Sequence, residues 1–207
     1  MTGYSPAEMI IRVGGRLLSI EGPPELFAKL AAGERSKRSL IAACVRRGDF
    51  LGAVGWYGHE DKLTAVIRWH AAARTPLREA LAAAWTSSEW PGRTWNTWYL
   101  LRLWRDIAAG ERIEDGESLP PGDPLTIYRG EGWDDEESGI AWTLDAERGR
   151  WFATTVPRVG SRDGRLLTGE APRAAILGYL TARREAEIII DPADVRILDE
   201  RDVSAPQ

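Results

Sequence analysis

An acidic pair, Glu185 and Glu187, leads into three isoleucines at 188–190, and an Asp-Pro turn signal at 191–192 ends the run. This stretch constrains the fold more than any other, because branched apolar residues bounded by a turn signal are typical of a short buried strand. We therefore expect a strand over 185–190. Since strand side chains alternate with period two, both glutamates should project from one face at its mouth. The pair is either a solvated edge or a site that needs two neighbouring carboxylates.

Two earlier segments have the same character. The sequence LTIY at 125–128 predicts a strand that ends in Arg129 and Gly130, and GIAWTL at 139–144 predicts another. Arg129 on its own is open to two interpretations. It either forms a surface salt bridge at a strand end, or it offers its planar guanidinium to a phosphate group.

The order and spacing of these pieces resemble the arginine–serine–glutamate class of mono-ADP-ribosyltransferases, the cholera-toxin-like and clostridial-toxin-like enzymes that use NAD. The resemblance covers residues 125–198. It rests on three short motifs, in chain order: Tyr128-Arg129-Gly130, then Ala141-Trp142-Thr143 ahead of a short helix with Phe152, and then Glu185-Ala186-Glu187.

The resemblance implies which residues would hold NAD. Arg129 would hold the diphosphate, and the backbone of Gly130 would approach the nicotinamide carboxamide. Thr143 would keep a hydroxyl in the cleft. Tyr128, Trp151 and Phe152 are candidates for contact with the nicotinamide ring, although all three residues also fit a packing role.

The resemblance also implies separate catalytic roles for the two carboxylates. Glu187 would hold the ribose 2′-hydroxyl and stabilise the cation that forms when nicotinamide leaves. Glu185 would orient and deprotonate the acceptor, and a glutamate at this place implies a guanidinium acceptor, hence an arginine on a protein. Ala141 departs from the pattern, which has a serine that bonds the catalytic glutamate, and this implies weakened or lost turnover.

Composition limits the other classes of function. The chain has 207 residues, 43% hydrophobic and 28% charged, as in an ordinary globular protein. A single cysteine excludes an internal disulfide, and two histidines are too few for a zinc site, so no metal is expected. A net charge of −4 does not favour nucleic acid as a partner. No signal peptide or apolar span is evident, so we expect no membrane partner and a cytoplasmic location, the host cytoplasm if the chain is phage-encoded.

The rhythm of the sequence changes at an acidic, turn-rich connector over 109–124. Before it, residues 1–124 are expected to form a helical lobe rich in tryptophan, with His59 and His70 as structural residues. After it, residues 125–207 are expected to form a mostly β core around the NAD cleft. Helices are expected near 24–32, 36–45, 63–71, 76–84, 95–108, 146–153 and 173–179, and strands near 125–129, 140–144, 154–159, 165–169, 185–190 and 195–198.

Helices followed by strands predict an α+β protein, in which a helical lobe packs on a split, mostly antiparallel sheet in one compact domain. Five tryptophans between Trp85 and Trp104 form either a buried core or an aromatic surface for a partner, and helical spacing favours the core. Two functions remain. One is an NAD-dependent transferase of a toxin-like or phage-type effector, which modifies a macromolecule. The other is a non-catalytic module of the same fold that binds a partner through its helical half.

Overall fold

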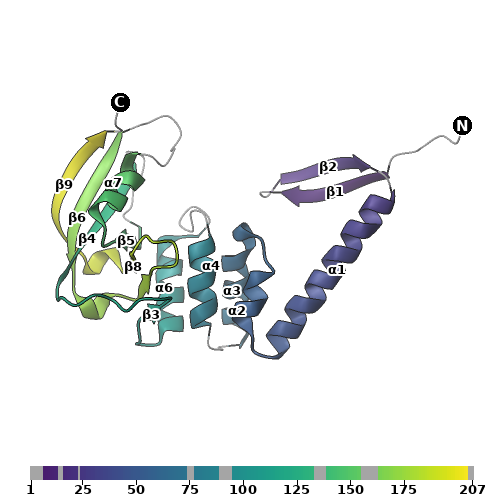
Figure 1. Ribbon diagram of the computed structural model, residues 1–207, viewed down its shortest axis with the longest axis horizontal. Helices are drawn as coiled ribbons and strands as arrows, with labels where there is room; N and C mark the ends of the chain where they lie inside the picture. Colours follow the sequence, from purple (N-terminus) through teal and green to yellow (C-terminus); the bar gives the residue numbers. More distant parts are fainter. Residues whose placement is uncertain are drawn as a thin grey trace, which may run out of the picture.

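The computed structural model describes residues 7–13, 16–22, 24–73, 77–88, 95–132, 139–154 and 163–204. Within them, helices lie mostly in the N-terminal half and strands mostly in the C-terminal half, so the predicted α+β class is confirmed. Figure 1 shows the sheet at one end of the molecule, a group of helices beside it, and a separate hairpin at the far end. None of the described helices is long and apolar enough to cross a membrane.

The N-terminal hairpin consists of β1 (Ala7–Val13) and β2 (Arg16–Gly22), which pair in antiparallel register. It lies in the half of the chain that the sequence analysis assigned to helices, so that part of the prediction is wrong. Two apolar runs separated by Gly14-Gly15 are a hairpin signal, and this signal was missed.

The helical lobe begins with α1, a single long helix that Gly33 does not end and Ser36 does not cap, contrary to the prediction. The helix continues through Gly33, which is exposed and where an added Cβ would meet nothing within 4 Å. The caps of the shorter helices are local: Asp49 accepts a hydrogen bond from Gly52 N, and Asn96 accepts one from Trp98 N. Thr94, the predicted cap, lies outside the described residues. The helices are α1 (Pro24–Arg46), α2 (Phe50–Gly55), α3 (His59–Ala73), α4 (Arg78–Ser87) and α6 (Thr97–Ala108).

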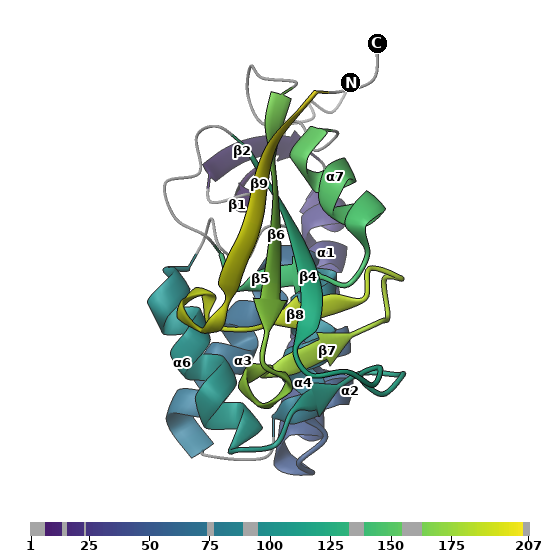
Figure 2. The same cartoon turned by 90° about the vertical axis from the view of Figure 1, so that its left-hand side faces the viewer.

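Seven strands form one mixed sheet in the order β3-β7-β8-β5-β4-β6-β9. Among the described strands of this sheet, only the β3–β7 pair is parallel, which confirms a mostly antiparallel sheet. The strands are β3 (Ile113–Glu114), β4 (Leu125–Gly132), β5 (Ala141–Thr143), β6 (Asp163–Ala171), β7 (Gly178–Leu180), β8 (Glu187–Ile189) and β9 (Arg196–Ser204). A single residue pair, Tyr128 with Thr143, joins the two halves of the sheet between β4 and β5. Figure 2 shows β4, β6 and β9 running steeply, with β7 and β8 lying across them.

Five of the six predicted strands correspond to β4, β5, β6, β8 and β9. The sixth, over 154–159, lies almost wholly outside the described residues. The prediction of a short helix over 173–179 is wrong. A single 3₁₀ turn, Arg173–Ala175, is present there, and β7 begins at Gly178. The predicted helix over 146–153 is α7 (Ala146–Thr154), and Asp145 caps it by accepting hydrogen bonds from the backbone N–H groups of the first turn.

The core lies on both faces of the sheet. On one face, Ile189 and Leu180 pack with Trp85 and Trp104 of the helical lobe, and on the other face Trp142 packs with Ile188 and Ile127. Of the five tryptophans between Trp85 and Trp104, those two are buried as predicted, Trp95 is partly buried, and Trp90 lies outside the described residues. Trp98 is the exception: 65% of it is exposed, because it stands on the first turn of α6, where Arg102 lies over its ring.

Candidate active site

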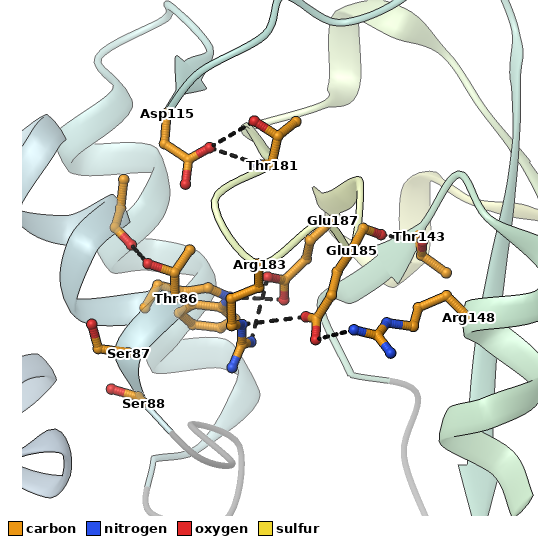
Figure 3. Close-up of polar contacts among 12 residues, drawn as sticks. Thr86, Ser87, Ser88, Asp115, Thr143, Arg148, Thr181, Arg183, Glu185 and Glu187 are labelled. Atoms are coloured by element: carbon orange, nitrogen blue, oxygen red, sulfur yellow. Dashed lines mark hydrogen bonds and ion pairs between the residues drawn. The ribbon is translucent and has the colours of Figure 1, made fainter. Parts of the chain in front are cut away.

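The three strands that carry the motifs, β4, β5 and β8, are neighbours in the sheet. Register pairs connect them directly, because Tyr128 on β4 lies opposite Thr143 on β5, and Thr143 lies opposite Glu187 on β8. Segments that are far apart in the sequence are thereby brought to one place, at the side of the sheet that faces α4 of the helical lobe (Figure 3).

Glu187 is a buried carboxylate that both halves of the protein hold. The indole Nε1 of Trp85, on α4, donates a hydrogen bond of 2.9 Å to its Oε1. Its Oε2 lies 3.8 Å from Nη2 of Arg183. Only 8% of Glu187 is exposed, whereas carboxylates are seldom buried without full pairing.

The environment of Glu187 makes its charge costly. Burial raises the pKa of Glu187 from the usual 4.5 to about 7, and the neighbouring charges of Glu185 and Asp115 act in the same direction. The hydrogen bond from Trp85 and the charge of Arg183 lower the pKa but do not offset burial. Strong perturbation by burial and specific partners is typical of functional carboxylates.

Glu185 does not belong to the strand. It lies in the turn before β8, where Arg184 and Ala186 have φ values of 56° and 45° in the left-handed region. The prediction that strand alternation puts the two glutamates on one face is therefore wrong, since the turn breaks the period. They are nevertheless brought together, because the guanidinium of Arg183 contacts both: its Nε lies 3.3 Å from Oε2 of Glu185.

Two further groups hold Glu185 in place. Thr143 Oγ1 donates a 2.5 Å hydrogen bond to the backbone carbonyl oxygen of Glu185, which gives this predicted site residue a positioning role. Nη2 of Arg148, on α7, donates to Glu185 Oε1 at 3.2 Å.

Arg148 in turn stacks on aromatic rings. Its guanidinium carbon lies 4.9 Å from the ring centre of Trp151 and 5.8 Å from that of Phe152, at cation–π distance. Phe152, a predicted nicotinamide contact, is thus placed beside the residue that pairs with Glu185. Sequence reasoning missed Arg148 and Trp85, because no local pattern connects either residue with the glutamates.

Arg129 is held by partners of its own. Nε donates to Oε1 of the buried Glu131 at 2.8 Å, and Nη1 donates to the carbonyl oxygen of Ala141 at 2.6 Å. Nη2 points at Gly139, where an added Cβ would lie 2.6 Å away. The salt bridge of the alternative interpretation therefore exists, but it joins two residues of β4 and is largely buried instead of on the surface.

Gly130 and Tyr128 face α7. A Cβ on Gly130 would lie 2.2 Å from the carbonyl oxygen of Gly149 and 2.3 Å from the backbone nitrogen of Ala153. Tyr128 packs against the small cluster that includes Ala153 and Leu166. The close approach of α7 to β4 therefore explains why a glycine stands at position 130.

Ala141 does not lie opposite Glu187. Its register partner is Ile189, and its side chain packs against the core of the helical lobe. The residue opposite Glu187 is Thr143, two residues further along β5, and it carries a hydroxyl.

A pocket of about 970 Å³ lies elsewhere, on the helical lobe, and its lining includes His70, Arg78, Tyr99 and Asp106. None of the residues that line it is a predicted site residue. Among the described residues, no three His, Cys, Asp or Glu side chains gather so as to hold a metal ion.

Comparison of the chain with protein-family models, curated proteins and solved structures found no match. A function is therefore inferred from the site itself. Its central features are two carboxylates of different environment, one buried and one in a turn, held by two arginines, a threonine and an indole.

Proposed function

We propose that the protein is an NAD-dependent mono-ADP-ribosyltransferase that transfers ADP-ribose to a macromolecular acceptor, with protein arginine as the acceptor class. The observation that carries the proposal is the adjacency of β4, β5 and β8. It brings the buried Glu187 next to Glu185 and opposite Thr143.

Glu187 suits the breaking of the bond between ribose and nicotinamide. Positive charge develops on the ribose as neutral nicotinamide departs, and a carboxylate in a water-poor environment stabilises such charge far better than one in bulk water. The ionised form is the active one. A pKa of about 7 supplies it at and above neutral pH.

Glu185 suits activation of the incoming guanidinium. Its carboxylate already contacts two guanidinium groups, those of Arg148 and Arg183, so the turn presents a carboxylate to this chemical group. A carboxylate in that position orients the acceptor nitrogen and accepts its proton.

NAD would be held mainly from β4 and α7. Arg129 would meet the diphosphate with Nη2, while Nε and Nη1 keep their bonds to Glu131 and to the carbonyl oxygen of Ala141. Phe152 and Tyr128 would flank the nicotinamide ring. The backbone of Gly130, which lies beside α7, would approach the nicotinamide carboxamide. These assignments come from the resemblance of the motifs, and in the structure Nη2 of Arg129 is directed at Gly139.

The second candidate is a non-catalytic module of this fold that binds a partner through its helical half. Ala141, in place of the family's serine, favours it. Because Trp85 and Trp104 are core residues, an aromatic contact with a partner would come from the exposed tryptophans of the described helical half, Trp98 on α6 and Trp56 at the end of α2.

Incubation of the pure protein with NAD distinguishes the two. The transferase releases nicotinamide, and it labels a small guanidine such as agmatine when one is supplied. Glu187→Gln should lower release by about a hundredfold or more, the usual scale for loss of such a group. Folded wild-type protein that binds partners but releases no nicotinamide would favour the binding module.

A further inference from the structure

Arg183 lies where an acceptor arginine would have to lie. It stands in the turn between β7 and β8, and its guanidinium spans the two carboxylates (Figure 3). Nε is 3.3 Å from Oε2 of Glu185, and Nη2 is 3.8 Å from Oε2 of Glu187. With 39% of its side chain exposed, the group is accessible.

The proposed roles of the two glutamates give this position a meaning. Glu185, which contacts Nε of Arg183, would accept a proton from the guanidinium, and Glu187, which contacts Nη2, marks where the ribose cation forms. A guanidinium that touches both carboxylates is held between the base and the reacting carbon, the arrangement that makes an intramolecular reaction efficient. We propose that Arg183 is an acceptor for the protein's own activity, so that the chain ADP-ribosylates itself at this residue. The proposal rests on the proposed function.

The transfer balances as follows. Nη2 of Arg183, the nitrogen on the side of Glu187, attacks C1′ of the nicotinamide ribose and forms a new N–C bond. The bond from C1′ to the nicotinamide nitrogen breaks, and its electron pair leaves with nicotinamide, which becomes neutral. The guanidinium gives up one proton, which Glu185 accepts and passes to solvent. No oxidant, reductant or further reactant takes part.

Two neighbouring arginines fit the role less well. Arg148 contacts Glu185 alone, its Nε is buried, and its guanidinium is stacked over Trp151. Arg184 is exposed in the same turn, and its left-handed backbone, with φ of 56°, follows Arg183 directly. Arg184 is therefore a matched control, identical in chemistry and adjacent in sequence.

Self-modification at Arg183 would also limit the enzyme. An ADP-ribosyl group on this nitrogen fills the space beside Glu185 that an external guanidine needs, and its two phosphates add negative charge next to two carboxylates. Transfer to an external acceptor should therefore decline as the label on Arg183 accumulates.

The test incubates the purified full chain with NAD and follows the intact mass, then maps the modified residue by peptide fragmentation. We expect one ADP-ribosyl group, located on Arg183. The labelling half-time should stay the same over an about hundredfold dilution of the protein, as an intramolecular step requires. Arg183→Lys should lose the label and Arg184→Lys should keep it, with circular dichroism showing that both variants are folded.

Nicotinamide release and agmatine labelling, measured in the same samples, separate failure of the inference from failure of the proposed function. If both occur while Arg183 stays unmodified, or if labelling slows in proportion to dilution, the inference is overturned and the transferase stands. If folded wild-type protein releases no nicotinamide, both are overturned.

Discussion

The indole Nε1 of Trp85 donates a 2.9 Å hydrogen bond to Oε1 of Glu187, across 102 positions of sequence. The donor belongs to a helix of the lobe and the acceptor to a central strand of the sheet. Trp85 also meets Trp104 edge-on, with ring centres 5.4 Å apart, and Trp104 in turn reaches β7 at Gly178. The helical lobe thus fixes the position of the buried carboxylate and is more than a cover for the sheet.

Replacement of Trp85 by phenylalanine removes the donor but keeps an aromatic ring. Because this hydrogen bond favours the charged form, we expect the pKa of Glu187 to rise further above its value of about 7. Carboxyl-carbon NMR across a pH titration measures it. Trp104→Phe is the matched control, since the Nε1 of Trp104 is buried without a hydrogen-bond partner among the described residues. Equal Glu187 pKa values in the two variants would contradict the assigned role of Trp85.

Glu187 should make the stability of the protein depend on pH. Between 4.5 and about 7, a glutamate in the unfolded chain is ionised while Glu187 in the folded protein still holds its proton. The unfolded state then binds fewer protons, so the free energy of unfolding falls as pH rises through this window. The full loss, reached above about pH 7, is about 3 kcal/mol.

Urea unfolding of wild type and Glu187→Gln isolates this contribution, because the glutamine keeps an oxygen acceptor for Trp85 but does not titrate. The two proteins should be similarly stable below pH 4.5, and the variant should be more stable above about pH 7. In assays of activity, kcat/KM of the wild type should fall as pH drops below about 7, since protonation removes the active form. A stability difference that is constant with pH would show that Glu187 has an ordinary pKa.

Arg129 is best tested with lysine. Lysine keeps a positive charge near the buried Glu131 but lacks the planar fork that meets a diphosphate, so the fold should survive while NAD affinity drops by about tenfold or more. Calorimetric titration with NAD provides the measurement. Unchanged affinity in folded Arg129→Lys would mean that Arg129 serves only the β4–β5 junction.

Two glycines should respond in opposite ways to alanine. In Gly130→Ala, the new Cβ would collide with backbone atoms of α7 at 2.2 and 2.3 Å, which should destabilise the protein by about 2 kcal/mol or more. In Gly33→Ala the methyl group meets nothing within 4 Å inside α1. The higher helix propensity of alanine should therefore raise the free energy of unfolding by at most about 1 kcal/mol. Thermal unfolding of both variants compares them. A tolerated alanine at position 130 would disprove the close contact of β4 and α7.

The strands of the site could be predicted because their signals are local. Branched and aromatic runs over 125–128 and 188–190 have few alternatives to a buried strand, and Asp145 is a recognisable helix cap. The order of the strands, with β5 between β4 and β8, was not predicted, because periodicity alone does not specify strand order.

The rest depends on contacts that no local pattern encodes. Nothing in the sequence marks Ala186 for a left-handed backbone, yet that residue moves Glu185 off the strand. The ion pair of Arg148 with Glu185 and the bond from Trp85 to Glu187 join distant segments, and only the packed fold creates them. The hairpin of β1 and β2 is a different case. It could have been predicted, because the Gly14-Gly15 pair between two apolar runs is a local hairpin signal.

We propose that the two carboxylates, Glu185 and Glu187, divide the work of ADP-ribosyl transfer. Nicotinamide release and agmatine labelling, measured separately for wild type, Glu187→Gln and Glu185→Gln, test it most directly. We predict that Glu187→Gln lowers both rates by about a hundredfold or more, because the charge that stabilises the cation is gone. Glu185→Gln should retain most of the release, since water needs less activation than a guanidinium, and should lose the labelling. Equal effects of the two substitutions on both rates, or no release by folded wild-type protein, would contradict the account.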